Sequence, residues 1–426
     1  MPADPGRRLK IAVWHNLPSG GGKRALHDHV RGLIGRGHTV EAWCPPTADP
    51  GYLPLSPMVP EHVVALDWPA PTLGDKLQVT LGINRQIAAM DAHSRACAKQ
   101  IAQGGFDMLF ANTCRFFRAP MIGRHARLPS VLYLQEPYRW LYEALPRLPW
   151  LALAREDQPG LHPSTWRAAF LDWRTVRNAR VQAREEVASA TAFTRILVNS
   201  YFSRESVLRA YGLDAQVCYL GVDHGHFVDH GLPREDIVAG LGSVTPEKNL
   251  HLVIEAIGAL PLPRPRLVWI GNIALPSYQA DMEALAATRG VVLDLQIGIS
   301  DIEVVALLNR VALMVYAPRL EPFGLAPLEA NSCGVPVVAT REGGMRETVR
   351  DGVNGIVTDA NPAALAVAIA RLRCDPALAR ELGGNGRRMV VTNWSLDAAT
   401  IRLEEELMHC TRAVENDRRL PDANPT

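Results

Sequence analysis

The sequence predicts two doubly wound α/β domains, each built on a parallel sheet. The first reason is length, because 426 residues exceed what one hydrophobic core normally supports. The second is the alternation of short apolar runs with amphipathic stretches in both halves of the chain, which is typical of βαβ units. The third is the segment 221–235, whose three glycines and lack of periodicity indicate a domain boundary.

The first βαβ unit lies near the N-terminus. Residues 10–17 form an apolar run that predicts a buried strand, three glycines at 20–22 predict a turn, and residues 25–34 carry apolar side chains at helical spacing. A second strand is predicted at residues 39–43 and completes the unit. Further strands of this half are predicted at residues 108–111, 130–134 and 195–199.

Residues 140–192 are predicted to be helical, with a loop broken by prolines near residues 158–163. The segment is rich in Trp, Leu, Arg and Ala and has no strand pattern. We expect its Trp and Leu side chains to face the core rather than a membrane, namely Trp140, Leu141, Trp150 and Leu151. Because several arginines lie nearby, a peripheral membrane contact would be located here.

The second half repeats the alternation of strands and helices. Its strands are predicted at residues 237–244, 266–270, 291–295, 313–317, 335–340 and 355–357. The chain is thereby divided into a domain at 1–222, a second domain at 236–396, and a C-terminal helix with a tail at 397–426. Ligands of doubly wound sheets bind beyond the carboxyl ends of the strands. We therefore expect two domains that face one another across a ligand cleft.

The composition is that of an ordinary globular protein, with 47% apolar residues, 21% charged residues and a net charge of +1. The charge is uneven along the chain. Residues 1–215 hold 26 Lys and Arg against 18 Asp and Glu, whereas residues 216–426 hold 19 against 26. A basic first half could face an anionic membrane surface or an acidic acceptor, and random scatter of surface charge explains the difference equally well.

Seven scattered cysteines without a C-x-x-C pair favour reduced thiols over a disulfide framework or a zinc site. The apolar run after Arg7 and Arg8 is too short for a signal peptide, and no stretch of about 18 apolar residues occurs elsewhere. We therefore expect a cytoplasmic protein, with a peripheral contact at the inner face of the membrane as a further expectation.

The clearest chemistry lies in residues 313–340. A predicted strand ends at Ala317, Glu321 follows in the loop, and Gly324 allows the backbone to approach a ligand closely. The next predicted helix carries Glu329, and its N-terminal N–H groups suit a diphosphate. Two carboxylates beside an anion site suit a ligand rich in hydroxyl donors, which points to a nucleotide sugar. Spacing alone would fit two solvated surface acids equally well.

The stretch EPFGLAPLEANSCGVPVVATREGG, which begins at Glu321, is similar to the E-x7-E motif of the retaining glycosyltransferases of family 4. Members of that family adopt the GT-B fold, which has two Rossmann-like domains. The resemblance implies that Glu321 contacts hydroxyl groups of the transferred sugar and that Glu329 holds the ribose. It also implies that the backbone N–H groups around Phe323, Gly324 and Leu325 meet the sugar and the phosphates.

Lys248, in the stretch LGSVTPEKNL, aligns with the family's GR-x4-KG motif, in which Arg and Lys neutralise the leaving diphosphate. Gly242 occupies the glycine position, and Ser243 stands where the family has arginine. A lost charge-assisted hydrogen bond, worth about 1.5–3 kcal/mol, would slow departure of the leaving group about tenfold or more. The cations that could replace it are Arg319, Arg24 and Lys23.

Two further groups of residues resemble the family in outline. Gln296 and Gly298 follow a predicted strand, where family members bind the base with their backbone. Gly20 and Gly21 resemble the glycine pair that approaches the leaving phosphates and the acceptor. Gln135 stands where many members place a histidine near the reacting sugar, and glutamine cannot act as a base. The resemblance then implies that the leaving phosphate accepts the acceptor's proton.

Other classes of site are disfavoured. The sequence has neither a Walker A loop nor a dinucleotide-binding fingerprint, which argues against an ATPase and a dehydrogenase. His27 and His29 would diverge on a helix, so they and His15 are expected to be core or solvated residues rather than metal ligands. No D-x-D sequence occurs, and we expect no metal in the site.

The resemblance implies a retaining hexosyltransferase that uses a nucleotide-diphosphate sugar, a UDP- or GDP-sugar, as co-substrate and needs no cofactor. The expected acceptor is a saccharide, a lipid-linked saccharide or a small molecule bound by the first domain, and no nucleic acid is expected as a partner. A GT-B epimerase or phosphorylase is an alternative within enzymes. The alternative from another class is a catalytically degenerate GT-B scaffold or binding protein, which Ser243 and Gln135 motivate.

Overall fold

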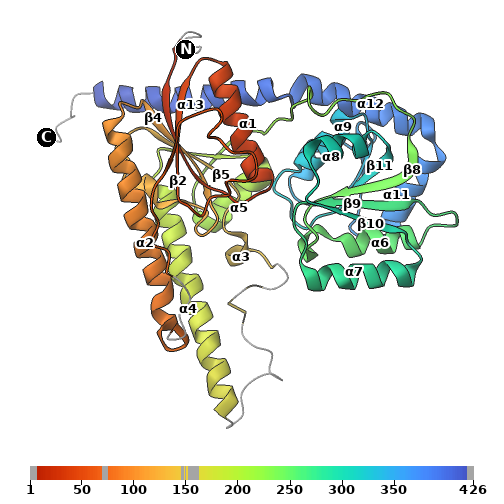
Figure 1. Cartoon of the computed structure of the whole chain (residues 1–426), viewed down its shortest axis with the longest axis horizontal. Helices are drawn as coiled ribbons and strands as arrows, with labels where there is room; N and C mark the ends of the chain where they lie inside the picture. The colour runs from red at the N-terminus through yellow and green to blue at the C-terminus, as the bar shows by residue number, and fades with distance from the viewer. Residues whose placement is uncertain (1–6, 70–74, 145–147, 149, 152–162, 420–426) are drawn as a thin grey trace. The chain divides into compact units, whose positions relative to one another are not determined.

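The computed structural model describes residues 7–69, 75–144, 148, 150–151 and 163–419. The chain forms two compact units, each with its own sheet and helices (Figure 1). The first unit comprises Met1–Val198, Ser203–Cys218 and Leu403–Thr426, and the second comprises Asn199–Phe202 and Tyr219–Arg402. The chain therefore passes from one unit to the other inside two of its helices as well as in connecting segments.

The first unit is built on a parallel sheet with the strand order β3-β2-β1-β4-β5-β6-β7. Its strands are β1 (Lys10–Asn16), β2 (Thr39–Cys44), β3 (Glu61–Val63), β4 (Met108–Cys114), β5 (Ser130–Gln135), β6 (Arg195–Val198) and β7 (Gln216–Val217). The helices are α1 (Gly21–Gly35), α2 (Asp75–Gln103), α3 (Arg139–Tyr142), α4 (Pro163–Thr191), α5 (Tyr201–Tyr211) and α13 (Leu396–Arg419), of which α5 and α13 are shared with the second unit. The described part also contains one short 3-10 helix, η1 (Met121–Arg124).

The central strands form because their side chains are apolar on both faces. Every residue of β4 is buried, as is every residue of β1 after Lys10. Such continuous burial is typical of parallel strands covered by helices on both sides. Helix α1 packs one apolar stripe on this sheet, formed by Leu26, Val30 and Leu33.

The second unit is built on a parallel sheet with the strand order β10-β9-β8-β11-β12-β13. Its strands are β8 (Glu235–Leu241), β9 (Arg266–Gly271), β10 (Leu293–Ile297), β11 (Val311–Tyr316), β12 (Val337–Thr340) and β13 (Gly355–Thr358). The helices are α6 (Leu250–Gly258), α7 (Pro276–Arg289), α8 (Asp301–Leu308), α9 (Leu325–Ser332), α10 (Met345–Thr348), α11 (Pro362–Cys374) and α12 (Pro376–Asn393), and η3 (Pro246–Lys248) is a 3-10 turn. The strand order reverses between β8 and β11, where doubly wound sheets bind ligands.

The predicted fold class is confirmed, since both units have parallel α/β sheets with helices on their faces. The sequence pattern missed β3 and β7, which are only three and two residues long. The helical prediction for 140–192 agrees with α3 and α4, and most of the predicted loop at 158–163 lies outside the described residues. No described helix is both long and apolar enough to cross a membrane.

One expectation about the core was wrong. Trp140, Trp150 and Leu151 are 49%, 44% and 60% exposed, and only Leu141 of that group is buried. For Trp140 the physical reason is local: α3 has only four residues, and this single turn buries Leu141 and leaves the neighbouring side chain in solvent. All seven cysteines are unpaired, in agreement with the expectation that no disulfide framework forms.

Candidate functional site

The candidate site of the second unit lies at the carboxyl ends of its two central strands, β8 and β11. Lys248 ends the turn η3 that follows β8, and Glu321 lies in the loop that follows β11. The Lys248 ammonium donates to Glu321 Oε2 over 2.7 Å, and the two side chains are 26% and 15% exposed. Two residues that the sequence assigned to one site from positions 73 apart are therefore in direct contact.

The backbone around Lys248 holds its side chain in place. Gly242 has φ +154°, and a Cβ there would lie 3.1 Å from Lys248 Cδ, so only glycine lets the aliphatic stem of Lys248 lie against this turn. Trp269 Nε1 donates to the Gly242 carbonyl over 2.8 Å. Asn249 is in the left-handed region and donates to the Ala317 carbonyl over 2.8 Å, which joins the segments that follow β8 and β11.

Two glycines support the loop that carries Glu321. The Gly344 N–H donates to the Glu321 carbonyl over 2.7 Å. A Cβ at Gly343 would lie 2.2 Å from that same carbonyl oxygen, and one at Gly344 would lie 2.1 Å from the Pro322 carbonyl oxygen. Neither position tolerates a side chain without a shift of the loop, so the Gly343-Gly344 pair helps to fix the position of the Glu321 backbone.

Helix α9 begins directly after this loop. Gly324 precedes it with φ +93°, and no side chain caps its first N–H groups. Phe323 is buried at 2% exposure, so the chain enters the helix with the side chain of this residue in the core. Leu325 is the first helical residue. An uncapped helix start of this kind is suited to an anion.

Glu329 lies on α9 and is only 6% exposed. Its carboxylate and that of Glu321 act on the same phenol, Tyr316, the last residue of β11. Burial raises the pKa of Tyr316 well above its usual value, and the nearby charges of Glu321 and Glu329 and a hydrogen bond to Glu321 raise it further. The structure thus brings both predicted acids to one place, together with Tyr316, which the sequence reasoning missed because a tyrosine ending a buried strand looks like a core residue.

Ser243, at the position of the missing arginine, donates to Asn272 Oδ1 over 3.1 Å and supplies no charge. Of the cations considered as replacements, Arg319 lies in the second unit, two residues before Glu321. Its Nε lies 3.6 Å from Glu342 Oε2, and its backbone N–H donates to the Glu247 carbonyl over 2.9 Å. Arg319 is therefore the candidate that shares a loop with the site.

The base-binding prediction concerns β10, which is the edge strand next to β9. Gln296 Nε2 donates to Asp294 Oδ1 over 2.6 Å. Gly298 has φ +71°, no described atom within 4 Å of its Cβ position, and an N–H that donates to the Gly271 carbonyl over 2.7 Å. Both residues lie at the carboxyl edge of the sheet, and β9 separates them from β8. No contact between them and Glu321 is seen among the described residues.

In the first unit the glycine loop and Gln135 come together. Gly20 has φ +136°, and Gly21 begins α1. A Cβ on the next residue, Gly22, would lie 3.4 Å from both side-chain atoms of the Gln135 amide. Gln135 itself has φ +62°, an uncommon backbone conformation for a residue other than glycine, and its buried Nε2 has no partner among the described residues. A strained residue with an unpaired amide beside a glycine loop is typical of a binding site.

Residues 226–389 match the family model of the group 1 glycosyl transferases. A GDP-mannose-dependent alpha-(1-6)-phosphatidylinositol monomannoside mannosyltransferase from Mycolicibacterium smegmatis is 30% identical over 230 residues, which cover 49% of this chain and 60% of that relative. A D-inositol 3-phosphate glycosyltransferase from Streptomyces bingchenggensis is 27% identical over 304 residues, covering 64% and 66%. The comparisons support the family of group 1 glycosyl transferases. The matched part thus spans about three fifths to two thirds of these relatives' length.

Solved structures agree with the two-unit α/β fold of this chain. The sucrose-phosphate synthase of Thermosynechococcus elongatus superposes with a TM-score of 0.70 at 19% identity, covering 95% of this chain and all of that one. Anabaena Alr3699/HepE, in complex with UDP and glucose, superposes with a TM-score of 0.67 at 19% identity, covering 94% and 99%. At this identity the likeness shows the fold alone, which is the GT-B fold.

A second polar cluster lies in the first unit, outside the residues that match the family model. His15, Cys44 and Glu61 have their ligand-capable atoms within 4.8 Å of one another, an arrangement that could hold a metal. His15 Nε2 lies 3.2 Å from Glu61 Oε1, and burial lowers the pKa of His15 and raises that of the Cys44 thiol to about 12. The ammonium of buried Lys23 already supplies a cation to this cluster. We assign it as a buried polar network, and the absence of a metal stays a prediction.

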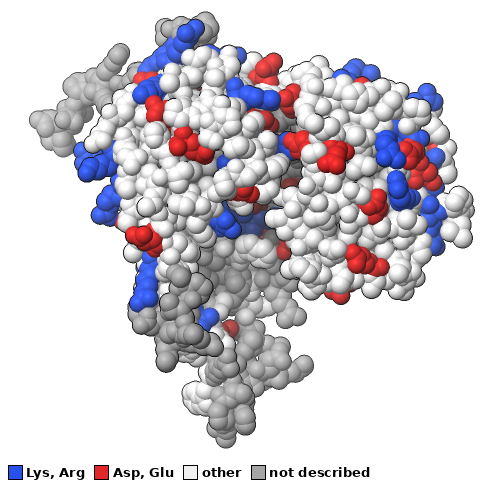
Figure 2. Space-filling model, viewed as in Figure 1, with Lys and Arg blue, Asp and Glu red and all other residues white. Residues whose placement is uncertain are grey.

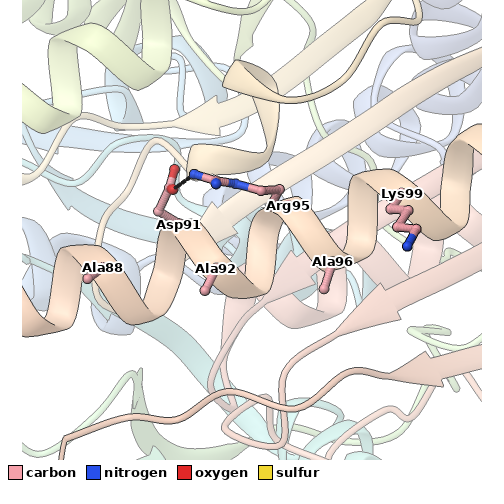
Figure 3. Close-up of a pocket in the computed structure, with 6 residues that line it drawn as sticks. All are labelled: Ala88, Asp91, Ala92, Arg95, Ala96 and Lys99. Atoms are coloured by element: carbon pink, nitrogen blue, oxygen red, sulfur yellow. Dashed lines mark hydrogen bonds and ion pairs between the residues drawn. The ribbon is translucent and has the colours of Figure 1, made fainter.

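Figure 3 shows a hollow of about 500 Å³ on the outer face of α2. Its lining consists of three alanines one turn apart and three charged residues, namely Ala88, Asp91, Ala92, Arg95, Ala96 and Lys99. Arg95 pairs with Asp91, which also accepts from His125 Nε2 over 2.7 Å. Two of the three charged groups of the hollow are thus paired along the helix surface, and the hollow adds nothing to the candidate site.

Proposed function

We propose that the protein transfers a hexosyl group, with retention of configuration and without a metal ion, from a nucleotide-diphosphate sugar to a saccharide, lipid-linked saccharide or small-molecule acceptor. The observation that carries this proposal is the 2.7 Å contact between Lys248 and Glu321 beside the uncapped start of α9. A cation and free N–H groups suit the diphosphate, and acids suit the hydroxyl groups of the sugar and ribose. The match of residues 226–389 to group 1 glycosyl transferases supports the same chemistry.

The ion pair between Lys248 and Glu321 suggests how both side chains change hydrogen-bond partners when the donor binds. The Lys248 ammonium is paired with the Glu321 carboxylate. A bound diphosphate would take the lysine as its partner and leave the Glu321 carboxylate to accept from sugar hydroxyls. Glu329, one turn into α9, would accept from the ribose. The leaving phosphate, held by Lys248, would receive the acceptor's proton, because Gln135, which stands where many family members have histidine, cannot act as a base.

We infer that the donor carries UDP or GDP. Support for both exists among similar proteins, since one relative is named as GDP-mannose-dependent and a solved structure of the same fold contains UDP and glucose. For the acceptor, we propose the loop of Gly20, Gly21 and Gln135 in the first unit as its contact. The unpaired Gln135 amide could donate to an acceptor hydroxyl or phosphate.

We further propose that the protein acts in the cytoplasm, at the inner face of the membrane where its acceptor is lipid-linked. Seven unpaired cysteines, six of them buried, support a reducing compartment. The function of the domains follows the same proposal: residues 1–222 would bind the acceptor and residues 236–396 the donor.

A thermal-shift screen of nucleotide diphosphates and their sugars, followed by transfer assays with the sugars that bind, tests this function. A ligand at 100 times its Kd stabilises the folded state by about 2.7 kcal/mol, which is readily measured. Stabilisation by one nucleotide sugar together with turnover supports the enzyme. No stabilisation by any nucleotide sugar would contradict the proposal.

The second candidate function is a catalytically degenerate scaffold or binding protein. Ser243 favours it, because this residue bonds to Asn272 and brings no second cation to the diphosphate. The same screen separates the candidates. Tight nucleotide binding without transfer or hydrolysis, for UDP-, GDP- and ADP-sugars alike, would establish the scaffold.

A further inference from the structure

Helix α4 carries a line of six side chains along one face. The residues follow one another at spacings of three or four, namely Trp166, Phe170, Trp173, Arg177, Arg180 and Arg184. At 100° per residue, such spacings keep all six side chains within a narrow stripe. The first three are aromatic and the last three are arginines, so the stripe changes from apolar to cationic along the helix. We call it the α4 stripe.

The aromatic half of the α4 stripe is exposed. Trp166, Phe170 and Trp173 are 73%, 44% and 53% exposed, and the rings of Phe170 and Trp173 lie 5.9 Å apart. Figure 1 shows this N-terminal half of α4 extending beyond the sheet of the first unit. Large aromatic side chains are costly to leave in water, so neighbouring exposed aromatics on one helix face indicate an interaction surface.

The opposite face of α4 attaches the helix to its unit. Gln182 Nε2 donates to the Phe116 carbonyl over 3.1 Å. Glu186 is fully buried and accepts from the N–H groups of Arg118 and Ala119 over 2.9 and 2.8 Å. Both residues lie about 180° around the helix from the α4 stripe. Because that face is attached to the first unit, the α4 stripe on the opposite face points away from it.

The cationic half of the α4 stripe presents two arginines to solvent. Arg180 and Arg184 are exposed. Arg184 pairs with Glu185, but that carboxylate is shared with Arg124, whose Nη1 donates to it over 2.8 Å, so one acid serves two arginines. Asp172 is the acid of the aromatic half, and it lies on another face of the helix.

We propose that the α4 stripe binds the surface of an anionic phospholipid bilayer. Tryptophan and phenylalanine side chains on a helix face enter the boundary between headgroups and acyl chains, and arginines on that face bind lipid phosphates. The order along the helix sets the pose: the end at Trp166 enters deepest, and Arg180 and Arg184 remain at headgroup level. This proposal gives the expected peripheral membrane contact a location, and it does not depend on the donor-site assignment.

Co-sedimentation of the full chain with vesicles tests the proposal. We expect binding to vesicles of phosphatidylcholine mixed with phosphatidylglycerol, and much weaker binding to phosphatidylcholine alone or at high salt. The double variant Trp166→Ser, Trp173→Ser should bind anionic vesicles about tenfold or more weakly. Arg180→Gln should weaken binding about fivefold. In wild type, tryptophan emission should shift to shorter wavelength when anionic vesicles are added, and the double variant should lack this shift.

Two matched controls come from exposed residues elsewhere. Ile302→Ser removes an apolar side chain that is 76% exposed on α8, and Arg209→Gln removes an arginine whose side chain is 66% exposed on α5. Both should bind vesicles like wild type. Equal binding by the double variant and wild type would overturn the proposal, as would failure of wild type to bind anionic vesicles. If sedimentation velocity instead shows dimers that the double variant loses, the stripe is an interface between copies. Thermal shift with nucleotide sugars should be unchanged in every variant, which separates this result from the donor assignment.

Discussion

At the scale of single residues, the three charged groups of the candidate donor site should have separable effects. Glu329→Ala should weaken nucleotide-sugar affinity by about tenfold or more, because it removes a charge-assisted hydrogen bond to the ribose. Glu321→Ala should mainly lower kcat, since its contacts are proposed to be with the reacting sugar. Lys248→Met keeps the aliphatic packing on Gly242 and should lower kcat by removing the partner of the leaving diphosphate. Steady-state kinetics and donor titrations measure both effects.

The control for this series is Glu381→Ala, at an exposed acid on α12. It should leave kcat and affinity unchanged. If Glu321→Ala and Glu329→Ala both retain wild-type kinetics, the site lies elsewhere in the chain.

A buried acid of the first unit, Glu186, makes the stability of the protein depend on pH. Burial raises the pKa of Glu186 to about 7, despite hydrogen bonds from Ala119, Arg118 and Tyr211, whereas its usual value is 4.5. Between pH 4.5 and about 7 the folded state retains a proton that the unfolded state has released. The free energy of unfolding should therefore fall as pH rises through this window, and the penalty is absent below it and complete above it.

Urea unfolding at pH 5 and pH 8 measures this effect. Glu186→Gln cannot ionise and should show a flatter pH dependence than wild type. Its stability should be lower overall, because the amide nitrogen cannot accept one of the two backbone N–H groups. Parallel pH profiles of the two proteins would contradict the shifted pKa.

At the scale of elements, the glycine pair below Glu321 makes a sharp prediction. Gly344 has an ordinary φ of −73°, so a methyl group there would cause a clash with the Pro322 carbonyl without backbone strain. Gly344→Ala should lower the free energy of unfolding by about 1–3 kcal/mol and weaken donor binding by displacing the loop. Chemical denaturation measures the free energy of unfolding, and donor titration measures the affinity for the donor.

Gly35→Ala is the matched control, because no atom lies within 4 Å of its Cβ position and its φ is not positive. Near the end of α1 this change should be neutral or stabilising by up to about 1 kcal/mol. Equal effects of the two substitutions would mean that the loop does not depend on the close approach at Gly344.

The elements also show what the sequence could predict. The central strands were predicted to within three residues at each end, because they are apolar on both faces and this pattern can be read without knowing the neighbouring strands. The strands β3 and β7 were missed because three and two residues are too few to show an alternating or continuous apolar pattern. Lys248 and Glu321 were assigned to one site through a family pattern, whereas Tyr316 could not be found, since only the fold places its phenol beside two carboxylates.

At the scale of the whole molecule, the last helix is divided between the units, and local patterns could not predict this. Residues from Leu403 onward belong to the first unit. Glu404 is the central contact: Arg36 Nε donates to its Oε2 over 2.6 Å, and His38 Nε2 lies 2.9 Å from its Oε1. His38 is buried, and its Nδ1 accepts a hydrogen bond from the Leu9 N–H. Its Nε2 is therefore protonated and donates a hydrogen bond to the Glu404 carboxylate.

Glu404→Ala should therefore destabilise the first unit by about 1–3 kcal/mol, because a buried imidazole loses its acceptor. Thermal unfolding measures this, with Glu205→Ala as control at an acid that is 71% exposed and 4.0 Å from Arg209. The control should change stability by less than about 0.5 kcal/mol. An equally small effect of Glu404→Ala would show that the last helix does not hold the first unit together.

On the face drawn in Figure 2, charge is distributed more evenly than the sequence halves suggest. The first 215 residues are basic and the rest are acidic. Figure 2 nevertheless shows basic and acidic side chains interspersed on the visible face of each unit. A long-range field is therefore a weaker basis for membrane binding than the α4 stripe, where aromatic and cationic side chains share one helix face.

The division of α13 sets the order in which the protein can be completed on the ribosome. Chains emerge from the N-terminus and domains usually finish folding in that order. Here the first unit still lacks Leu403–Thr426 when the second unit, which ends at Arg402, has all of its residues. The unit whose residues come first along the chain is thus completed after the other one, because Glu404 can contact Arg36 and His38 only once all the residues of the second unit have been synthesised.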